Sequence, residues 1–185
     1  MRQKSARPLL LLLDADVVIE AHRLDVWEAL INRSRVACSA TVVRDEALFY
    51  RRDQFFPTSL NLQGLVAAGR ITMLEATTDD LCQLAAIVTH DVLEGLHAGE
   101  SEALALLLVG KAKAHLFCSG DRVALRTLAL LGLSQYGTSL QKVLQSLGLT
   151  KRLPENLTER FFRDALKEGQ EHRLRGLGLR TLPPA

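Results

Sequence analysis

Residues 8–13 (PLLLLL) form an apolar run that ends abruptly at two aspartates, Asp14 and Asp16. The run is too short for a helix and has no alternation of apolar and polar positions. It therefore predicts a strand buried on both faces, as in a parallel sheet. Further short apolar runs alternate with segments of helical spacing. This alternation predicts an α/β fold, a three-layer α/β/α sandwich with a central, mostly parallel sheet.

The same reading places the other elements along the chain. Further strands are expected at 36–39, 71–74, 115–119 and 133–137. Helices are expected at 21–33, 41–52, 77–93, 99–114, 121–132 and 138–148, with a loop at 53–63 and another helix after Pro154, at about 156–169. We expect residues 8–150 to form one domain. Residues 151–185 should form a helical extension that ends in a mobile tail with little to pack against.

Composition excludes several classes of protein. The three cysteines, Cys38, Cys82 and Cys118, are too widely spaced for a zinc motif or a disulfide framework, which predicts a reducing cytoplasm. The apolar run near the start is too short for a secretion signal, and no stretch predicts a membrane span. The aromatic fraction of 5% argues against a base-stacking surface like those of single-strand binders. Residues 53–150 are net acidic between two basic ends, which suits a carboxylate site with a basic rim.

Acidic residues fall where expected strands end or where the next helix begins. Asp14 and Asp121 lie at the carboxyl ends of two expected strands, and Glu46 lies in the helix after a third. Glu100 and Glu102 open another helix, where helical spacing points them about 200° apart. Because ligands bind beyond the carboxyl ends of parallel strands, these acids should gather at one edge of the sheet. An oxygen-rich cluster of this kind favours hard divalent cations.

The acidic segments resemble, in order, the motifs of the PIN-domain family, the ribonuclease fold shared by VapC-type toxins. The matching segments are LLLDADVVI (11–19), VVRDE (42–46), LHAGESEALALLL (96–108) and SGDR (119–122), and YGTSLQKVLQSLGL (136–149) resembles the segment that closes the GExE-containing branch. The resemblance covers residues 8–150. Two positions depart from the pattern: Ala40 replaces a common proline, and His97 replaces a common acid before GExE.

The resemblance implies a metal-dependent endoribonuclease that hydrolyses RNA phosphodiester bonds with Mg²⁺ or Mn²⁺. Asp14, Glu46, Glu102 and Asp121 are implied as metal ligands, with Glu100 as a further catalytic acid. Whether Glu100 or Glu102 faces the metal stays open at this point.

The resemblance also implies supporting roles and partners. Asp16 and Ser119 would support the ligands, and Arg122 could touch a phosphate beside Arg51 and Arg52, which are candidate RNA contacts. An RNA substrate, a cognate antitoxin and a second copy in a homodimer are the implied partners. Simpler roles are also open, because Asp16 could bond backbone amides and Asp121 could cap the helix that follows it.

Two other functions compete with this interpretation. Haloacid dehalogenase-like phosphatases also place DxD after an apolar strand, with the first aspartate as nucleophile, here Asp14. ACSAT (37–41) and Lys111 or Lys113 could imitate their other motifs, but no second acid follows SGDR. The third possibility is a PIN-like module that binds RNA or protein without cutting.

Overall fold

Strand β1 (Leu10–Leu13) lies inside a four-stranded sheet of order β5-β2-β1-β6 in the computed structural model, which describes residues 8–51 and 56–180. β1 pairs in parallel with β2 (Arg35–Ser39) and with β6 (Leu116–Cys118), and β2 pairs in parallel with β5 (Thr72–Leu74). The predicted α/β class with a central parallel sheet is confirmed. Because the pairings are parallel, the carboxyl ends of these strands share one edge.

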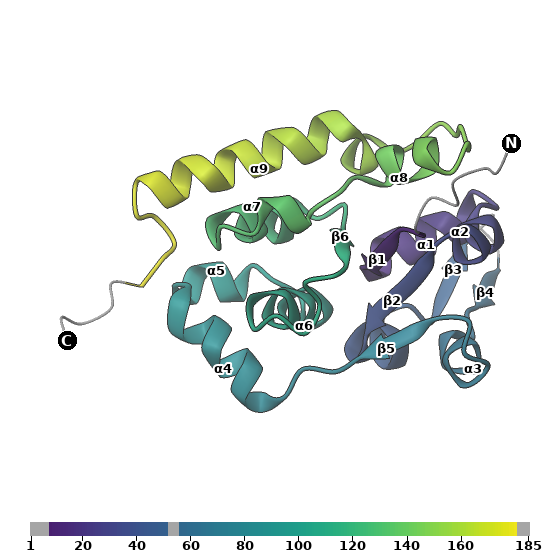
Figure 1. Cartoon of the computed structure of the whole chain (residues 1–185), viewed down its shortest axis with the longest axis horizontal. Helices are drawn as coiled ribbons and strands as arrows, with labels where there is room; N and C mark the ends of the chain where they lie inside the picture. Colours follow the sequence, from purple (N-terminus) through teal and green to yellow (C-terminus); the bar gives the residue numbers. More distant parts are fainter. Residues whose placement is uncertain (1–7, 52–55, 181–185) are drawn as a thin grey trace, which may run out of the picture.

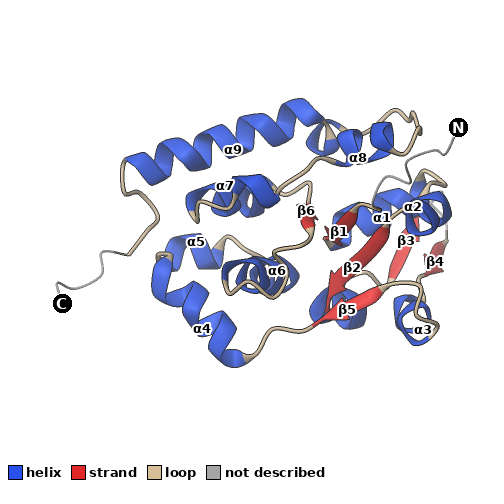
Figure 2. Ribbon diagram, viewed as in Figure 1, coloured by secondary structure: helices blue, strands red, loops and turns tan. Residues whose placement is uncertain are grey.

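Helices cover both faces of the sheet and complete the predicted three layers (Figure 1; Figure 2). Leu11 and Leu13 of β1 contribute to one core, whereas Leu12 contributes to the other, as the twofold alternation of a strand requires. The first core packs against α1 (Ala15–Arg23), α2 (Trp27–Arg33), α3 (Leu62–Ala67) and α8 (Leu140–Ser146). The second packs against α4 (Thr78–Ile87), α5 (His90–Glu94), α6 (Ala98–Leu108) and α7 (Arg122–Leu130).

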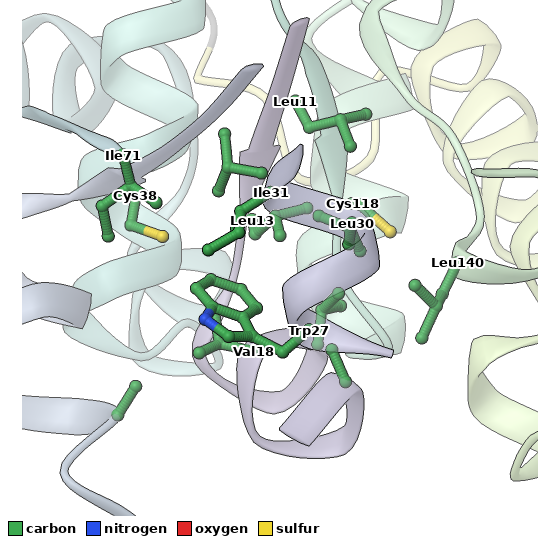
Figure 3. Close-up of a cluster of buried hydrophobic side chains, with 14 of the residues drawn as sticks. Leu11, Leu13, Val18, Trp27, Leu30, Ile31, Cys38, Ile71, Cys118 and Leu140 are labelled. Carbon is green, nitrogen blue, oxygen red and sulfur yellow. The ribbon is translucent and has the colours of Figure 1, made fainter. Parts of the chain in front are cut away.

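The first core is centred on the aliphatic residues of β1 and one aromatic ring. Figure 3 shows Trp27 packed among Leu13, Val18 and Leu30, with Cys38 of the neighbouring strand nearby. These side chains are at most 4% exposed. Leu11, Leu12 and Leu13, the end of the apolar run at 8–13, are thus buried on both faces of the sheet, as the composition of the run predicts.

Two expected helices are divided in the structure. The helix expected at 21–33 is α1 followed by α2, with a break at Asp25, whose φ of 57° lies in the left-handed region that Asp tolerates. The helix expected at 77–93 is α4 followed by α5. Val88 between them is extended and bridges Leu179 in an antiparallel pair, which explains the interruption.

The expected helix at 41–52 and the expected loop at 53–63 are wrong in part. A short π-helix, η1 (Val42–Glu46), is followed by a hairpin of β3 (Phe49–Arg51) and β4 (Pro57–Ser59). The aromatic pair Phe49–Tyr50 favours the extended conformation once the wide turn ends. The strand expected at 133–137 is also wrong: it is a 3-10 turn, η2 (Ser134–Tyr136), joined to β6 by one bridge at Gly137.

The C-terminal extension packs on the domain through a long helix. After the turn η3 (Glu155–Leu157), α9 (Glu159–Leu174) lies along α7, as Figure 1 shows for the yellow-green helix. The expectation that the following tail has little to pack against is incorrect for part of it. Thr89 donates a backbone hydrogen bond to Gly178, and Arg180 donates one to Ile87. Residues 181–185 lie outside the described part of the chain.

Within the described ranges, every helix is too short or too polar to cross a bilayer.

Gly169 brings the backbones of α9 and α7 together, and its replacement tests this packing. A Cβ at this position would overlap the carbonyl oxygen of Arg126 and press on Ala129. We expect Gly169→Ala to lower the free energy of unfolding by about 1–3 kcal/mol, although alanine is the better helix former. Urea denaturation measures this, with exposed Lys167→Ala as control. Equal or higher stability of Gly169→Ala would contradict the close packing.

Candidate functional site

An acidic cavity of about 520 Å³ lies beyond the carboxyl ends of β1 and β6. Its lining side chains come from segments far apart in the sequence. They are Asp14, Ala15, Asp16, Ile19, Glu46, His97, Glu100, Gly120, Asp121 and Asn156. The predicted gathering of acids at this edge therefore holds for Asp14, Glu46, Glu100 and Asp121.

Asp14 caps helix α1 and connects it to the end of β6. Its Oδ1 accepts a hydrogen bond from Ala15 N at 2.8 Å, and its Oδ2 accepts one from Ser119 Oγ at 2.8 Å. Ser119 Oγ in turn accepts the backbone N–H of Asp121 at 3.0 Å. Burial raises the pKa of Asp14 to about 6, although the hydrogen bonds from Ser119 and Ala15 lower it. The charges of Glu46 and Asp121 also raise this pKa.

Asp16 accepts a backbone hydrogen bond and also lines the acidic cavity, so both roles predicted for it are compatible. Its Oδ2 accepts the backbone N–H of Gly120 at 2.8 Å, whereas its Oδ1 is buried without a hydrogen-bond partner among the described residues. Burial, followed by the charge of Asp14, raises its pKa to about 7. A Cβ at Gly120 would collide with the Asp16 carboxylate and with Asn156, so this close approach requires glycine.

Glu46 enters the cavity from the end of the π-helix. Its Oε1 accepts the backbone N–H of Gly99 at 2.9 Å. A Cβ on Gly99 would overlap the same carboxylate, so the glycine of the GESE segment admits Glu46. The π-helix closes its wide turn through the hydrogen bond from Ala47 N to Val42 O.

Glu100 is the member of the GESE pair that faces the cavity. Its Oε2 accepts the backbone N–H of His97 at 2.9 Å, and the carboxylate is buried at 3% exposure. Burial raises the pKa of Glu100 to about 7, and the charges of Asp14 and Asp121 add to the shift. Donor atoms of His97, Glu100 and Asp121 lie within 4.8 Å of one another, close enough for one metal ion to contact all three.

Glu102 points away from the acidic cavity. Its Oε2 accepts the backbone N–H of Thr41 at 2.8 Å, and its Oε1 accepts that of Ala76 at 3.0 Å. The carboxylate therefore ties the segments that follow β2 and β5 to α6. Its assignment as a metal ligand is not supported by this geometry. The helical spacing that separates it from Glu100 by two residues is the physical reason.

Asp121 combines the predicted cap with a place at the cavity. Its Oδ1 accepts backbone hydrogen bonds from Val123 at 2.6 Å and from Ala124 at 2.9 Å, at the start of α7. Because the cap uses one oxygen for both bonds, the helix fixes the direction of the carboxylate. The two roles that the sequence left open are compatible.

Among the described residues, neither Arg51 nor Arg122 lines the acidic cavity. Arg122 forms a two-pronged ion pair with Glu168 of α9, with the shorter contact at 2.6 Å, and its guanidinium lies 5.3 Å from the ring centre of Phe161. The guanidinium is thus engaged by α9, and its contact with phosphate stays a prediction. Arg51 is exposed on β3, and Arg52 lies outside the described residues.

Two polar side chains of the lining, those of His97 and Asn156, were absent from the sequence-based site. His97 lies two residues before Gly99 of the GESE segment, and the Glu100 carboxylate beside it raises the pKa of the imidazole. Its proximity to that motif was the available signal. Asn156 donates a 3.3 Å hydrogen bond to the carbonyl of Gly120 and comes from the C-terminal extension, where no sequence pattern pointed to the site.

Comparison of this chain with protein-family models, curated proteins and solved structures finds no match. The resemblance to PIN domains therefore stays a prediction.

The raised pKa values predict how the stability of the metal-free protein depends on pH. The folded chain holds protons on Asp14, Asp16 and Glu100 up to pH values of about 6, 7 and 7, whereas the unfolded chain releases them near pH 4. The stabilisation is complete below pH 4 and is lost as pH rises through 7. In EDTA, the free energy of unfolding should fall by about 6 kcal/mol from pH 5 to pH 8, the sum of the losses from the three groups. Urea titrations that show constant or rising stability across this range would contradict the burial of these acids.

A matched pair of substitutions separates the roles of the two glutamates. Glu102→Gln leaves one backbone N–H without its acceptor, so we expect a loss of about 1–3 kcal/mol in stability with Mn²⁺ affinity unchanged. Glu100→Gln should instead weaken Mn²⁺ binding by about tenfold or more. Urea denaturation and Mn²⁺ electron paramagnetic resonance measure the two effects. The reverse pattern would restore Glu102 as the ligand.

Proposed function

We propose that this chain is a Mg²⁺- or Mn²⁺-dependent endoribonuclease whose site is the acidic cavity. The observation that carries the proposal is the convergence of Asp14, Glu46, Glu100 and Asp121 from separate segments into one cavity. Asp14 and Glu100 are buried and Glu46 and Asp121 are half-buried, so their carboxylates repel one another, and a divalent cation removes the repulsion. The choice of RNA rests on the order and spacing of the motifs that resemble PIN domains.

The residues at the cavity fit a hard cation. The buried Asp16 Oδ1 has no hydrogen-bond partner among the described residues, which leaves an oxygen available to a metal or to its bound water. Asp14, Glu46, Glu100 and Asp121 would hold one or two ions, with His97 at the rim. When bound, the metal supplies a water of lowered pKa and stabilises negative charge on phosphorus and the leaving oxygen.

The protein's own groups hold this arrangement in place. Ser119 donates its hydroxyl proton to Asp14 and fixes the orientation of that carboxylate. The start of α7 holds Asp121, and the backbone of Gly99 holds Glu46. In the metal-free site burial raises the pKa values of Asp16 and Glu100 to about 7, so Glu100 would release a proton when it binds a cation.

One feature of the structure disfavours the phosphatase alternative. Lys111 pairs with Asp80, and no lysine of the described residues lines the acidic cavity. The third reading, a module that binds without cutting, remains as an outcome of the assay below.

A finer proposal is that the chain is the toxin of a toxin–antitoxin pair and acts as a homodimer. It is supported by the resemblance to VapC-type toxins alone. Of the tail leucines that could meet another chain, Leu177 is exposed, Leu179 packs within the second core, and Leu182 lies outside the described residues. Growth arrest on expression, relieved by a small protein encoded next to it, would support the pair.

The direct test is RNA cleavage with Mg²⁺ or Mn²⁺ and with EDTA as control. Asp14→Asn and Asp121→Asn should each reduce cleavage by about a hundredfold or more, because each removes a charge that holds the metal. Asp79→Asn, an exposed acid of α4 outside the cavity, is the matched control and should keep full activity. p-Nitrophenyl phosphate is tested in parallel.

The outcomes separate the three functions. Metal-dependent cutting that both variants lose supports the nuclease. Turnover of p-nitrophenyl phosphate without RNA cutting would replace it with the phosphatase. Inactivity in both assays with RNA or protein binding retained would replace it with the binding module.

A further inference from the structure

A second cavity, also of about 520 Å³, lies at the opposite end of α1 from the acidic cavity. Three ring-bearing residues line it: His22 at the end of α1, Trp27 at the start of α2 and Tyr50 on strand β3. We call it the aromatic cavity. The chain has few aromatic residues, yet its only tryptophan and one of its two tyrosines meet here.

The three rings form a short ladder. The His22 and Trp27 rings are stacked, with centroids 4.5 Å apart and planes at 25°. His22 and Tyr50 are 5.6 Å apart and tilted by 34°. Trp27 is buried in the first core, as Figure 3 shows, whereas His22 and Tyr50 are half-buried. The accessible end of the ladder is therefore a planar surface of the kind that stacks on flat heterocycles.

The aromatic cavity offers both a hydrogen-bond acceptor and hydrogen-bond donors. His22 Nδ1 lies 2.8 Å from the carbonyl oxygen of Val18 and must donate to it, so Nε2 of the neutral ring is an acceptor. Burial lowers the pKa of His22 and favours this neutral form. Asn61 accepts the N–H of Gly64 through Oδ1, which directs its Nδ2 donors elsewhere.

The acids at this cavity are already engaged. Glu28 pairs with Arg70 at 2.9 Å, and Asp25 also has an interaction of its own. The lining is thus not a free negative pocket that calls for a cation. An ammonium or guanidinium group has donors only, and it would leave the Asn61 Nδ2 donors unmatched. A nucleobase edge has donors and acceptors together, beside two flat faces.

We propose that the aromatic cavity binds an unpaired base of the RNA strand that crosses the acidic cavity. This inference rests on the proposed nuclease function. Asp16 and His22 stand on the same helix, six residues apart, which is about 9 Å along its axis. A stacked strand covers that distance in about two or three nucleotides. The aromatic cavity would therefore hold a base a short way from the bond that is cut and set the register of the strand.

Tryptophan fluorescence tests this directly, because Trp27 is the only tryptophan of the chain and lines the cavity. The wild-type protein is titrated in EDTA with hexauridylate, with hexaadenylate and with a ribose-phosphate hexamer that lacks bases. N-acetylargininamide is the cationic probe. We expect a saturable change in emission with the two base-bearing strands, and affinity about tenfold lower or undetectable for the abasic one.

Variants of the ladder sharpen the result. Tyr50→Ala should weaken binding of the base-bearing strands by about tenfold, whereas Tyr50→Phe, which keeps the ring, should bind like the wild type. Phe49→Ala is the matched control, since Phe49 is its exposed neighbour on β3 and does not line the cavity. Circular dichroism checks that each variant is folded.

Several results would overturn the proposal. These are equal affinity for abasic and base-bearing strands, saturation by N-acetylargininamide instead of RNA, no emission change with any probe, or unchanged binding by Tyr50→Ala. Because the titration needs no metal, its outcome is distinct from that of the cleavage assay. Base binding without cleavage overturns the nuclease, and cleavage without base binding overturns the base site.

Discussion

The hydrogen bond from Ser119 Oγ to Asp14 Oδ2 joins the ends of two neighbouring strands at the edge where the acids meet. It exists because β1 and β6 pair in parallel, which brings residues 105 positions apart in sequence into contact. The same serine accepts the backbone N–H of Asp121, so one hydroxyl holds the Asp14 carboxylate and the backbone of Asp121. The acidic cavity depends on this connection.

The carboxylates around this bond are held against their own repulsion. Burial and mutual charge raise the pKa values of Asp14, Asp16 and Glu100, which means that the metal-free fold favours their protonated forms. Gly99 and Gly120 lack a Cβ, which lets the backbone approach the carboxylates of Glu46 and Asp16 closely. Asn156 of the C-terminal extension donates a hydrogen bond to the carbonyl of Gly120. Such an arrangement costs stability unless a cation is bound, which is the physical case for a metal site.

The sequence predicts the parts of this structure that depend on local pattern. The buried strand at 10–13 follows from an apolar run with no polar positions, and the positions of Asp14 and Asp121 follow from the ends of two such runs. Helical spacing also shows that Glu100 and Glu102 diverge. It does not show which one faces the cavity, because the partners of Glu102 are the backbone amides of Thr41 and Ala76, set by tertiary contacts.

Three other features could not be predicted from local sequence patterns, because tertiary contacts determine them. The hairpin that carries Tyr50 was expected to be helix and loop, so the aromatic cavity could not be foreseen. Arg122 was expected to contact a phosphate, but the sequence did not show that α9 would bring Glu168 and Phe161 beside its guanidinium. The break at Val88 depends on Leu179, 91 residues later.

Anomalous scattering from crystals grown with Mn²⁺ tests whether the acidic cavity holds a divalent cation. We expect an anomalous peak among the carboxylates of Asp14, Glu46, Glu100 and Asp121, and no peak beside Glu102. An ordered cavity without a peak at saturating Mn²⁺, or a peak elsewhere only, would contradict it.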